Sequence, residues 1–149
     1  MKMTTSAKHT HSIHVDAPVE KVFEYIEVPG NIVAAMNAMP GEGELVLGEV
    51  DQKPDGEVAD YRMTFRELGM HMHTTMTREE YMPNERITDH SSLGVDHMFS
   101  VAPEDTGTKL TYAWDATKLM RMIDATLFHT DKHIGEALQH VKKEVEALP

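Results

Sequence analysis

The segment Ile13-His14-Val15-Asp16-Ala17-Pro18-Val19-Glu20-Lys21-Val22-Phe23 joins an expected strand to an expected helix. Over residues 9–15, Ile13 and Val15 alternate with polar residues, which is typical of a short strand. Asp16 and Pro18 favour a helix start, with an acidic cap and a proline in the first turn. Four apolar residues then follow at helical spacing and form one stripe: Val19, Val22, Phe23 and Ile26.

A second short helix is expected over 31–37, between the breakers Pro29-Gly30 and Met39-Pro40-Gly41. From 43 to 117 the pattern changes to short apolar alternations separated by turns, which predicts antiparallel hairpins in a six-strand meander. The expected turns lie at 53–56, 68–69, 82–85 and 104–107.

Residues 118–148 are expected to form one long helix, because apolar residues recur at every third or fourth position. Only Thr130-Asp131 interrupts this apolar seam. A helix of this length spans about 45 Å, so it must lie across the concave face of the sheet. The predicted fold class is α+β, with a curved antiparallel sheet of about seven strands wrapped around the long helix and two short helices after the first strand.

Length and composition limit the classes of function. The 149 residues suit a single domain, 1–149. With 14 basic and 25 acidic residues the net charge is −11, which opposes binding to nucleic acid or to anionic membranes. The absence of cysteine excludes disulfides, thiolate nucleophiles, thiolate zinc sites and iron–sulfur clusters. No apolar segment resembles a secretory signal or a membrane span, so we expect a cytoplasmic monomer or homodimer.

The segment 13–23 and the order of elements resemble the START-like superfamily, also called SRPBCC or Bet v 1-like. In many bacterial members a strand runs into Ala-Pro and then into a helix with valine and an aromatic residue at this spacing. Residues 25–31 resemble the helix–Pro–x–Asn junction of the superfamily, and residues 106–111 resemble its penultimate turn and last strand. The resemblance implies a helix-grip fold that encloses a cavity, in which relatives bind lipids, polyketides, sterols, quinones or hormones, and some catalyse reactions.

One segment departs from that pattern. Many relatives carry a tryptophan-containing segment after the junction, whereas residues 33–39 read Val33-Ala34-Ala35-Met36-Asn37-Ala38-Met39 here. Flexible methionines therefore replace a bulky ring near the expected mouth of the cavity, and the ligand preferences of relatives do not carry over.

The hairpin through 68–69 predicts which side chains face the cavity. A two-residue loop pairs Phe65 with Met72 and Tyr61 with Met76, and paired residues share a face of the sheet. The predicted inward set is apolar and consists of Tyr61, Met63, Phe65, Met70, Met72 and Met76. The predicted outward set is polar and consists of Arg62, Thr64, Arg66, His71, His73 and Thr75.

The chain contains twelve methionines, and many of them fall on segments that would bound the cavity. A single methionine is most often ordinary core packing, but many together suit an adaptable apolar pocket, because methionine repacks around ligands of different shape. Met120 and Met122 are expected to add to this wall from the last helix. The predicted ligand-binding residues are Met36, Met39, Tyr61, Met63, Phe65, Met70, Met72, Met76, His97, Phe99, Tyr112, Trp114, Ile123 and Leu127.

Two histidine patterns raise the question of metals. The run from Met70 to His73 with Met76 offers thioether and imidazole ligands for copper, but consecutive strand residues point to opposite faces and cannot chelate one ion. On the last helix, a stripe of three histidines and one glutamate lies away from the apolar seam. Adventitious metal binding or solubility therefore explains this stripe better than an enclosed metal site does. The members of that stripe are His129, His133, Glu136 and His140. We expect no metal site and no cofactor.

The catalytic residues are left unknown, and the candidates are His97, Tyr112 and Tyr61. His97 alternates with Phe99 and is expected to point inward, where an imidazole is suited to move protons. The alternative is a structural histidine whose ring is satisfied by a backbone carbonyl or by Tyr112. Arg78 and Glu80 share the parity of Met76 along the strand, which predicts that they point inward. There they would lie at the wet mouth of the cavity or be hydrogen-bonded. The alternative is that a β-bulge turns them outward.

The sequence predicts a domain that binds a hydrophobic or amphipathic small molecule, such as a lipid, a polyketide or a quinone, in a central cavity. The first alternative is an enzyme that resembles polyketide cyclases/dehydrases, with His97 and a tyrosine as acid and base. The second is an Hsp90-activator-like protein-interaction module that uses its acidic outer surface. An interior filled by side chains would favour this last alternative.

Overall fold

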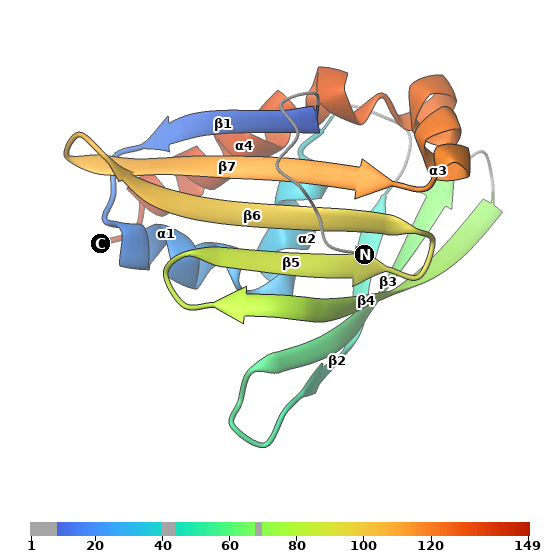
Figure 1. Cartoon of the computed structure of the whole chain (residues 1–149), viewed down its shortest axis with the longest axis horizontal. Helices are drawn as coiled ribbons and strands as arrows, with labels where there is room; N and C mark the ends of the chain where they lie inside the picture. The colour runs from blue at the N-terminus through green and yellow to red at the C-terminus, as the bar shows by residue number, and fades with distance from the viewer. Residues whose placement is uncertain (1–8, 40–43, 68–69) are drawn as a thin grey trace.

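The computed structural model describes residues 9–39, 44–67 and 70–149. One antiparallel sheet curves around the helices, which lie on its concave side (Figure 1). The predicted α+β architecture is confirmed. The elements in chain order are β1 (Thr10–Val15), α1 (Val19–Ile26), α2 (Pro29–Asn37), β2 (Leu45–Gln52), β3 (Val58–Glu67), β4 (Met70–Met82), β5 (Arg86–Ser91), β6 (Val95–Glu104), β7 (Gly107–Ala116), α3 (Lys118–Ile123), the π-helical turn η2 (Asp124–Phe128) and α4 (Thr130–Glu146).

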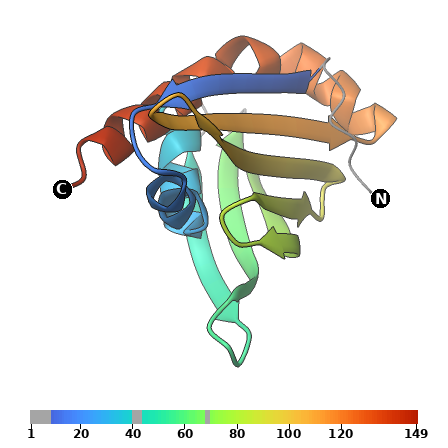
Figure 2. The same cartoon turned by 60° about the vertical axis from the view of Figure 1, so that its left-hand side comes forward.

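The seven strands lie in the order β1-β7-β6-β5-β4-β3-β2. Strands β2 to β7 form the predicted six-strand meander, and β1 joins its far edge by pairing with β7. Figure 2 shows the curvature of the sheet, with β1 and β7 lying along α4 and β2 and β3 running away from it. The edge strand β2 pairs with β3 through two register shifts, after Leu47 and after Asp51.

The predicted register of the β3–β4 hairpin is confirmed. Phe65 pairs with Met72 and Tyr61 pairs with Met76. Tyr61 and Met76 are buried, whereas His71 on the opposite face is exposed. The expected turn at 68–69 and the side chains of residues 66, 67 and 70 lie outside the part of the chain that the structure describes.

A β-bulge in β4 decides the direction of two charged residues. The pairing with β5 shifts between Arg78 and Glu80, and a bulge re-aims the side chains that follow it. Arg78 therefore points inward and is buried, while Glu80 points outward and pairs with Arg86 at 2.8 Å. Of the two directions that the sequence left open, Arg78 takes the first and Glu80 the second.

The start of α1 differs from the prediction in one detail. Pro18 occupies the N-cap, and no side chain caps the helix. The carboxylate of Asp16 instead accepts a hydrogen bond of 2.9 Å from His14 Nε2, so its predicted role as the cap is wrong. Pro29, expected as a breaker, opens α2 as its first residue, since a proline at this position loses no helical hydrogen bond.

The predicted single helix over 118–148 is divided into α3, η2 and α4. His129 adopts a left-handed conformation with φ 52°, and its N–H donates to the Asp124 carbonyl at 2.7 Å. The Asp124 carboxylate accepts hydrogen bonds from the Thr130 N–H and hydroxyl, which starts α4 in a new direction. Because α3 turns away from α4 (Figure 1), Met122 is 60% exposed and does not belong to the predicted wall.

The core lies between α4, α1, α2 and the half of the sheet nearest β1. The apolar seam of α4 is buried there, as predicted, and each fully buried aliphatic or aromatic side chain contributes about 1.5–3 kcal/mol to folding. The seam consists of Ile134, Leu138, Val141 and Val145. No helix within residues 9–39, 44–67 and 70–149 combines the length and the apolar character needed to cross a bilayer.

Two glycines provide a matched test of this packing. A Cβ on Gly107 would collide with the backbone carbonyl of Val15, so we expect Gly107→Ala to lower the free energy of unfolding by about 2 kcal/mol or more. A Cβ on Gly135 in α4 meets nothing within 4 Å, so we expect Gly135→Ala to raise it by about 0.5–1 kcal/mol. Urea denaturation of both variants measures the two changes, and equal effects would contradict the described contact between β1 and β7.

Candidate functional site

A cavity of about 530 Å³ lies between the concave face of the sheet, α2 and the segment from α3 to the start of α4. This volume falls within the range of small-molecule pockets, roughly 300–1,000 Å³. Eleven of the fourteen residues predicted from the sequence line it: Met36, Met39, Tyr61, Met63, Phe65, Met76, His97, Phe99, Tyr112, Trp114 and Leu127.

Three predicted residues are not part of the described wall. Met72 is half-buried beside Phe65 but does not border the cavity, and the side chain of Met70 lies outside the described residues. Ile123 belongs to α3, and because the chain turns after it, Leu127 and Phe128 of η2 line the cavity instead. Met120, expected from the last helix, does border the cavity.

The sequence analysis missed much of the polar part of the wall. Asp89 and Ser91 point inward because they share the parity of the buried Ile87 in β5, a signal that was present in the alternation of residues 86–91. His133 was expected on an exposed stripe, yet it borders the cavity because the break at His129 changes the direction of α4. The other residues missed are Ile32, Asn37, Leu45, Thr74, Leu93, Val95, Asp124, Thr126, Phe128 and Thr130.

The cavity has an open end and a closed end. Leu127 in η2 is 42% exposed, and Asn37 at the end of α2 is exposed as well, so these residues mark the mouth. Tyr61, Met76 and Tyr112 are no more than 2% exposed and mark the closed end. The tyrosines on the sheet are therefore reached from solvent past α2 and η2.

A buried ion pair stands at the closed end. Arg78 Nε donates to Asp89 Oδ1 at 3.0 Å, and Arg78 Nη2 donates to Asp89 Oδ2 at 3.2 Å. The Tyr61 hydroxyl donates to the same Oδ2 at 2.6 Å. Burial, together with the negative charge of Asp89, raises the pKa of Tyr61 above its ordinary value. Since the two charges neutralise each other, this end presents polar atoms to a ligand without a net charge.

The same arginine ties the sheet to the end of α1. Arg78 Nη1 donates to the backbone carbonyl of Glu27 at 2.9 Å, and the Tyr81 hydroxyl donates to the Glu27 carboxylate at 2.7 Å. Burial and then this hydrogen bond raise the pKa of Tyr81 to about 12. The ring of Tyr81 also contacts Phe23 of α1, with centroids 5.7 Å apart. These contacts hold the helical layer against β4 on one side of the cavity.

His97 and Tyr112 form the second polar group of the wall. His97 Nδ1 lies 2.6 Å from the Tyr112 hydroxyl. Burial lowers the pKa of His97 and raises the pKa of Tyr112, so both groups are neutral near pH 7. Within the described residues, Nδ1 is the acceptor found for the buried phenol, and donation from the phenol leaves Nε2 of His97 protonated. The hydrogen bond to Tyr112 that the structural interpretation of His97 expected is present, and a catalytic role for His97 stays a prediction.

Trp114 is held in the wall by residues from β1 and α4. Its indole Nε1 donates to Asp131 Oδ1 at 3.0 Å, and the His9 ring packs against it with centroids 4.3 Å apart. His9 and His11 also contact the Asp131 carboxylate, at 2.8 and 2.7 Å. Although burial opposes the shift, the hydrogen bonds from His11 and Trp114 lower the pKa of Asp131. The start of β1 and the start of α4 are thus joined beside the cavity.

Comparison with solved structures finds many similar folds. The protein Ms6760 from Mycobacterium smegmatis matches 93% of this chain and 90% of its own with a TM-score of 0.67 at 12% identity. A protein from Rhodobacter sphaeroides matches 99% of both chains with a TM-score of 0.67 at 15% identity. CV1439 from Chromobacterium violaceum matches 93% of this chain and 99% of its own with a TM-score of 0.64 at 20% identity. No family model matches the sequence, and no curated protein does.

The predicted fold is now established by these matches and by the topology. The chain adopts the helix-grip fold. At these identities the likeness concerns the fold alone, and the chemistry of the cavity is set by the residues of this chain that line it.

The half-buried position of His97 predicts a pH dependence for the stability of this helix-grip domain. Its pKa is lowered from the ordinary 6.5, so the unfolded chain binds a proton that the folded chain does not. The contribution of the neutral His97 ring to the free energy of unfolding is therefore complete above about pH 7. It falls as the pH drops through the pKa that this histidine has in the unfolded chain. We expect wild type to lose more stability than His97→Gln between about pH 7 and pH 5, measured by urea denaturation. Parallel pH profiles would contradict the burial of the ring.

Proposed function

We propose that the domain binds a hydrophobic or amphipathic small molecule, of lipid, polyketide or quinone type, in the central cavity. The observation that carries the proposal is a void of about 530 Å³ whose wall is mainly apolar and whose closed end holds paired polar groups. Soluble domains pack their interiors densely, and a void of this size costs contacts that a guest restores.

The wall supports an apolar body for the ligand. In the described wall, methionines come from four elements, with Met36 in α2, Met63 in β3, Met76 in β4 and Met120 in α3. Each apolar Å² that the ligand removes from water contributes about 25 cal/mol to binding. Flexible thioether side chains also let one wall fit ligands of different shape.

The polar groups support a neutral polar head. Arg78 and Asp89 satisfy each other, so they offer no free charge to balance a ligand carboxylate or amine. His97 retains a ring nitrogen beyond its bond to Tyr112, and the hydroxyls of Thr74 and Ser91 lie 2.7 Å apart in the wall. A carbonyl or phenol oxygen fits such donors better than an ionised group does.

A cavity-filling variant tests the proposal. Met63 lines the cavity, and we expect Met63→Trp to weaken binding of N-phenyl-1-naphthylamine, a neutral apolar fluorescent probe, by about tenfold or more. Met82 is 37% exposed and lies outside the wall, so Met82→Trp is the matched control and keeps the wild-type affinity. Equal probe affinities for all three proteins would refute binding in the cavity. Native mass spectrometry of the purified wild-type protein tests for a co-purifying guest.

The second candidate is a cyclase/dehydrase-like enzyme, and the His97–Tyr112 pair favours it. A neutral imidazole hydrogen-bonded to a phenol can take up and return a proton beside a bound substrate. For this candidate we expect turnover of aromatic polyketide mimics that His97→Gln abolishes while probe affinity is retained. Probe binding without turnover in wild type identifies a carrier. The void gives no support to the interaction module, for which a filled interior was the expected sign.

A further inference from the structure

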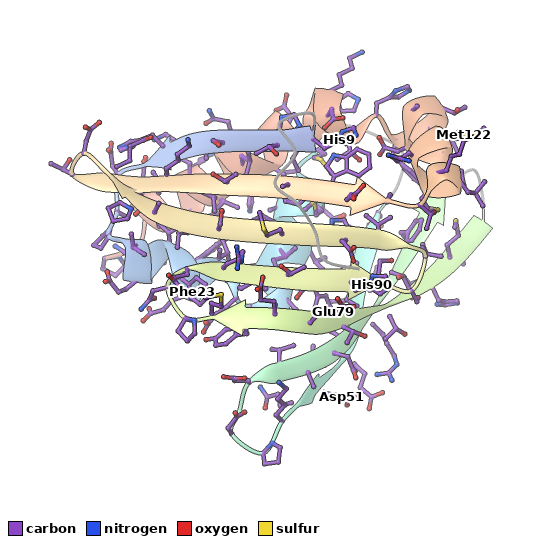
Figure 3. The ribbon with its side chains drawn as sticks, in the orientation of Figure 1. His9, Phe23, Asp51, Glu79, His90 and Met122 are labelled. Atoms are coloured by element: carbon purple, nitrogen blue, oxygen red, sulfur yellow. The ribbon has the colours of Figure 1, made fainter. Side chains whose placement is uncertain are left out.

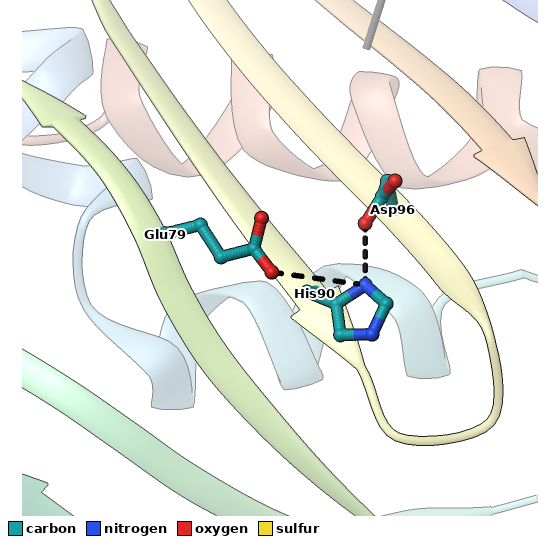
Figure 4. A group of neighbouring side chains, drawn as sticks. All are labelled: Glu79, His90 and Asp96. Atoms are coloured by element: carbon teal, nitrogen blue, oxygen red, sulfur yellow. Dashed lines mark hydrogen bonds and ion pairs between the residues drawn. The ribbon is translucent and has the colours of Figure 1, made fainter. Parts of the chain in front are cut away.

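Three chemistry-bearing side chains that the cavity does not use meet on the opposite face of the sheet. Glu79 from β4, His90 from β5 and Asp96 from β6 lie side by side, away from the helices (Figures 3 and 4). One ligand atom from each residue lies within 4.8 Å of the other two. His90 Nδ1 is 2.6 Å from Asp96 Oδ1 and 4.0 Å from Glu79 Oε1.

The strand pairing explains how this cluster forms. His90 points outward between the inward residues Asp89 and Ser91, and it pairs with Asp96 across β5 and β6. Glu79 sits in the bulge of β4, between the two positions at which the pairing with β5 shifts. Bulges re-aim side chains at sheet surfaces. The bulge that sends Arg78 inward thus also leaves Glu79 beside His90.

The buried carboxylate of Asp96 also favours a bound cation. Its side chain is 1% exposed, and Oδ2 has no hydrogen-bond partner within the described residues. A buried carboxylate oxygen without a partner is costly, and carboxylates in that state are commonly compensated by a cation. Figure 4 shows Oδ1 of this carboxylate directed at the His90 ring and the other oxygen turned away from it, so a cation beside the ring would be held by Oδ1 and would neutralise the group as a whole.

The negative charges around the cluster also favour a bound cation. Asp115 of β7 is the cross-strand neighbour of Asp96, so a third carboxylate stands next to the first two. None of the ion pairs found between described residues brings a lysine or arginine to Glu79, Asp96 or Asp115. Neighbouring carboxylates repel one another, and a bound cation removes that repulsion.

We propose that Glu79, His90 and Asp96 bind a divalent transition-metal ion of the zinc type on the convex face of the sheet. One imidazole nitrogen and two carboxylate oxygens form a borderline donor set, which suits Zn²⁺ better than the all-oxygen cations Mg²⁺ and Ca²⁺.

The distances allow this ion with small side-chain movements. Ligand atoms about 2.1 Å from a tetrahedral ion lie about 3.4 Å apart. The pair of His90 and Asp96 must widen from 2.6 Å, and the pair of His90 and Glu79 must close from 4.0 Å. The metal takes the Nδ1 lone pair, so the neutral His90 ring carries its proton on Nε2 in the metal-bound state. The remaining coordination position is left to water.

The test is a titration of the ¹⁵N-labelled full chain with zinc chloride, followed by NMR. We expect saturable shifts at the amides of residues 79, 90 and 96 and at the His90 ring nitrogens. Glu79 is exposed, so Glu79→Gln leaves the fold intact and is expected to weaken this binding about tenfold to a hundredfold, the cost of losing even an outer-shell partner. His90→Ala is expected to abolish it.

His73→Ala is the matched control, because His73 is an exposed histidine on the same face of β4. We expect it to leave the shifts and the affinity unchanged. Zinc that shifts only other residues, such as those around His9 and His11, overturns the proposal, and so does binding at residues 79, 90 and 96 that Glu79→Gln leaves unchanged. Neither outcome bears on the cavity, whose probe binding is measured without metal.

Discussion

One buried charge pair joins the sheet to the helical layer beside the cavity. The guanidinium of Arg78 gives two hydrogen bonds to Asp89 and a third to the carbonyl at the end of α1. Removing either partner of such a pair leaves an unpaired charge in an apolar interior, at a cost of about 3–5 kcal/mol. The pair therefore fixes β4, β5 and the end of the first helix relative to one another on one side of the cavity.

The bulge after Arg78 lets one strand serve both faces of the sheet. Without an extra residue, Glu80 would follow Arg78 into the interior, where no second arginine is available among the described residues. With it, Glu80 meets Arg86 outside and Glu79 stands beside His90. A single local irregularity thus keeps Glu79 and Glu80 on the outer surface of the sheet and out of the cavity wall.

The sequence was sufficient for the fold because the decisive signals are local. The apolar stripe of residues 19–26 predicts the first helix, and the turns divide the strands. The predicted pairing of β3 with β4 then placed Tyr61 and Met76 correctly. The break at His129 could not be foreseen, since it depends on the hydrogen bonds between Asp124 and Thr130 that form only when α4 packs on the sheet. The direction of Asp89 could be derived from the alternation of residues 86–91, whereas the outer cluster depends on pairing across β4, β5 and β6, which no local pattern reveals.

The two register shifts in β2 have a consequence for how copies of the molecule meet. This strand forms one edge of the sheet, and its outer side carries Glu49 and Asp51, which are drawn toward Arg62 of β3. A kinked, acidic edge is a poor template for another strand. The shifts interrupt the regular spacing of the unpaired backbone N–H and C=O groups, and the acidic side chains repel those of a second copy. The open sheet is thereby protected against growing into edge-to-edge aggregates.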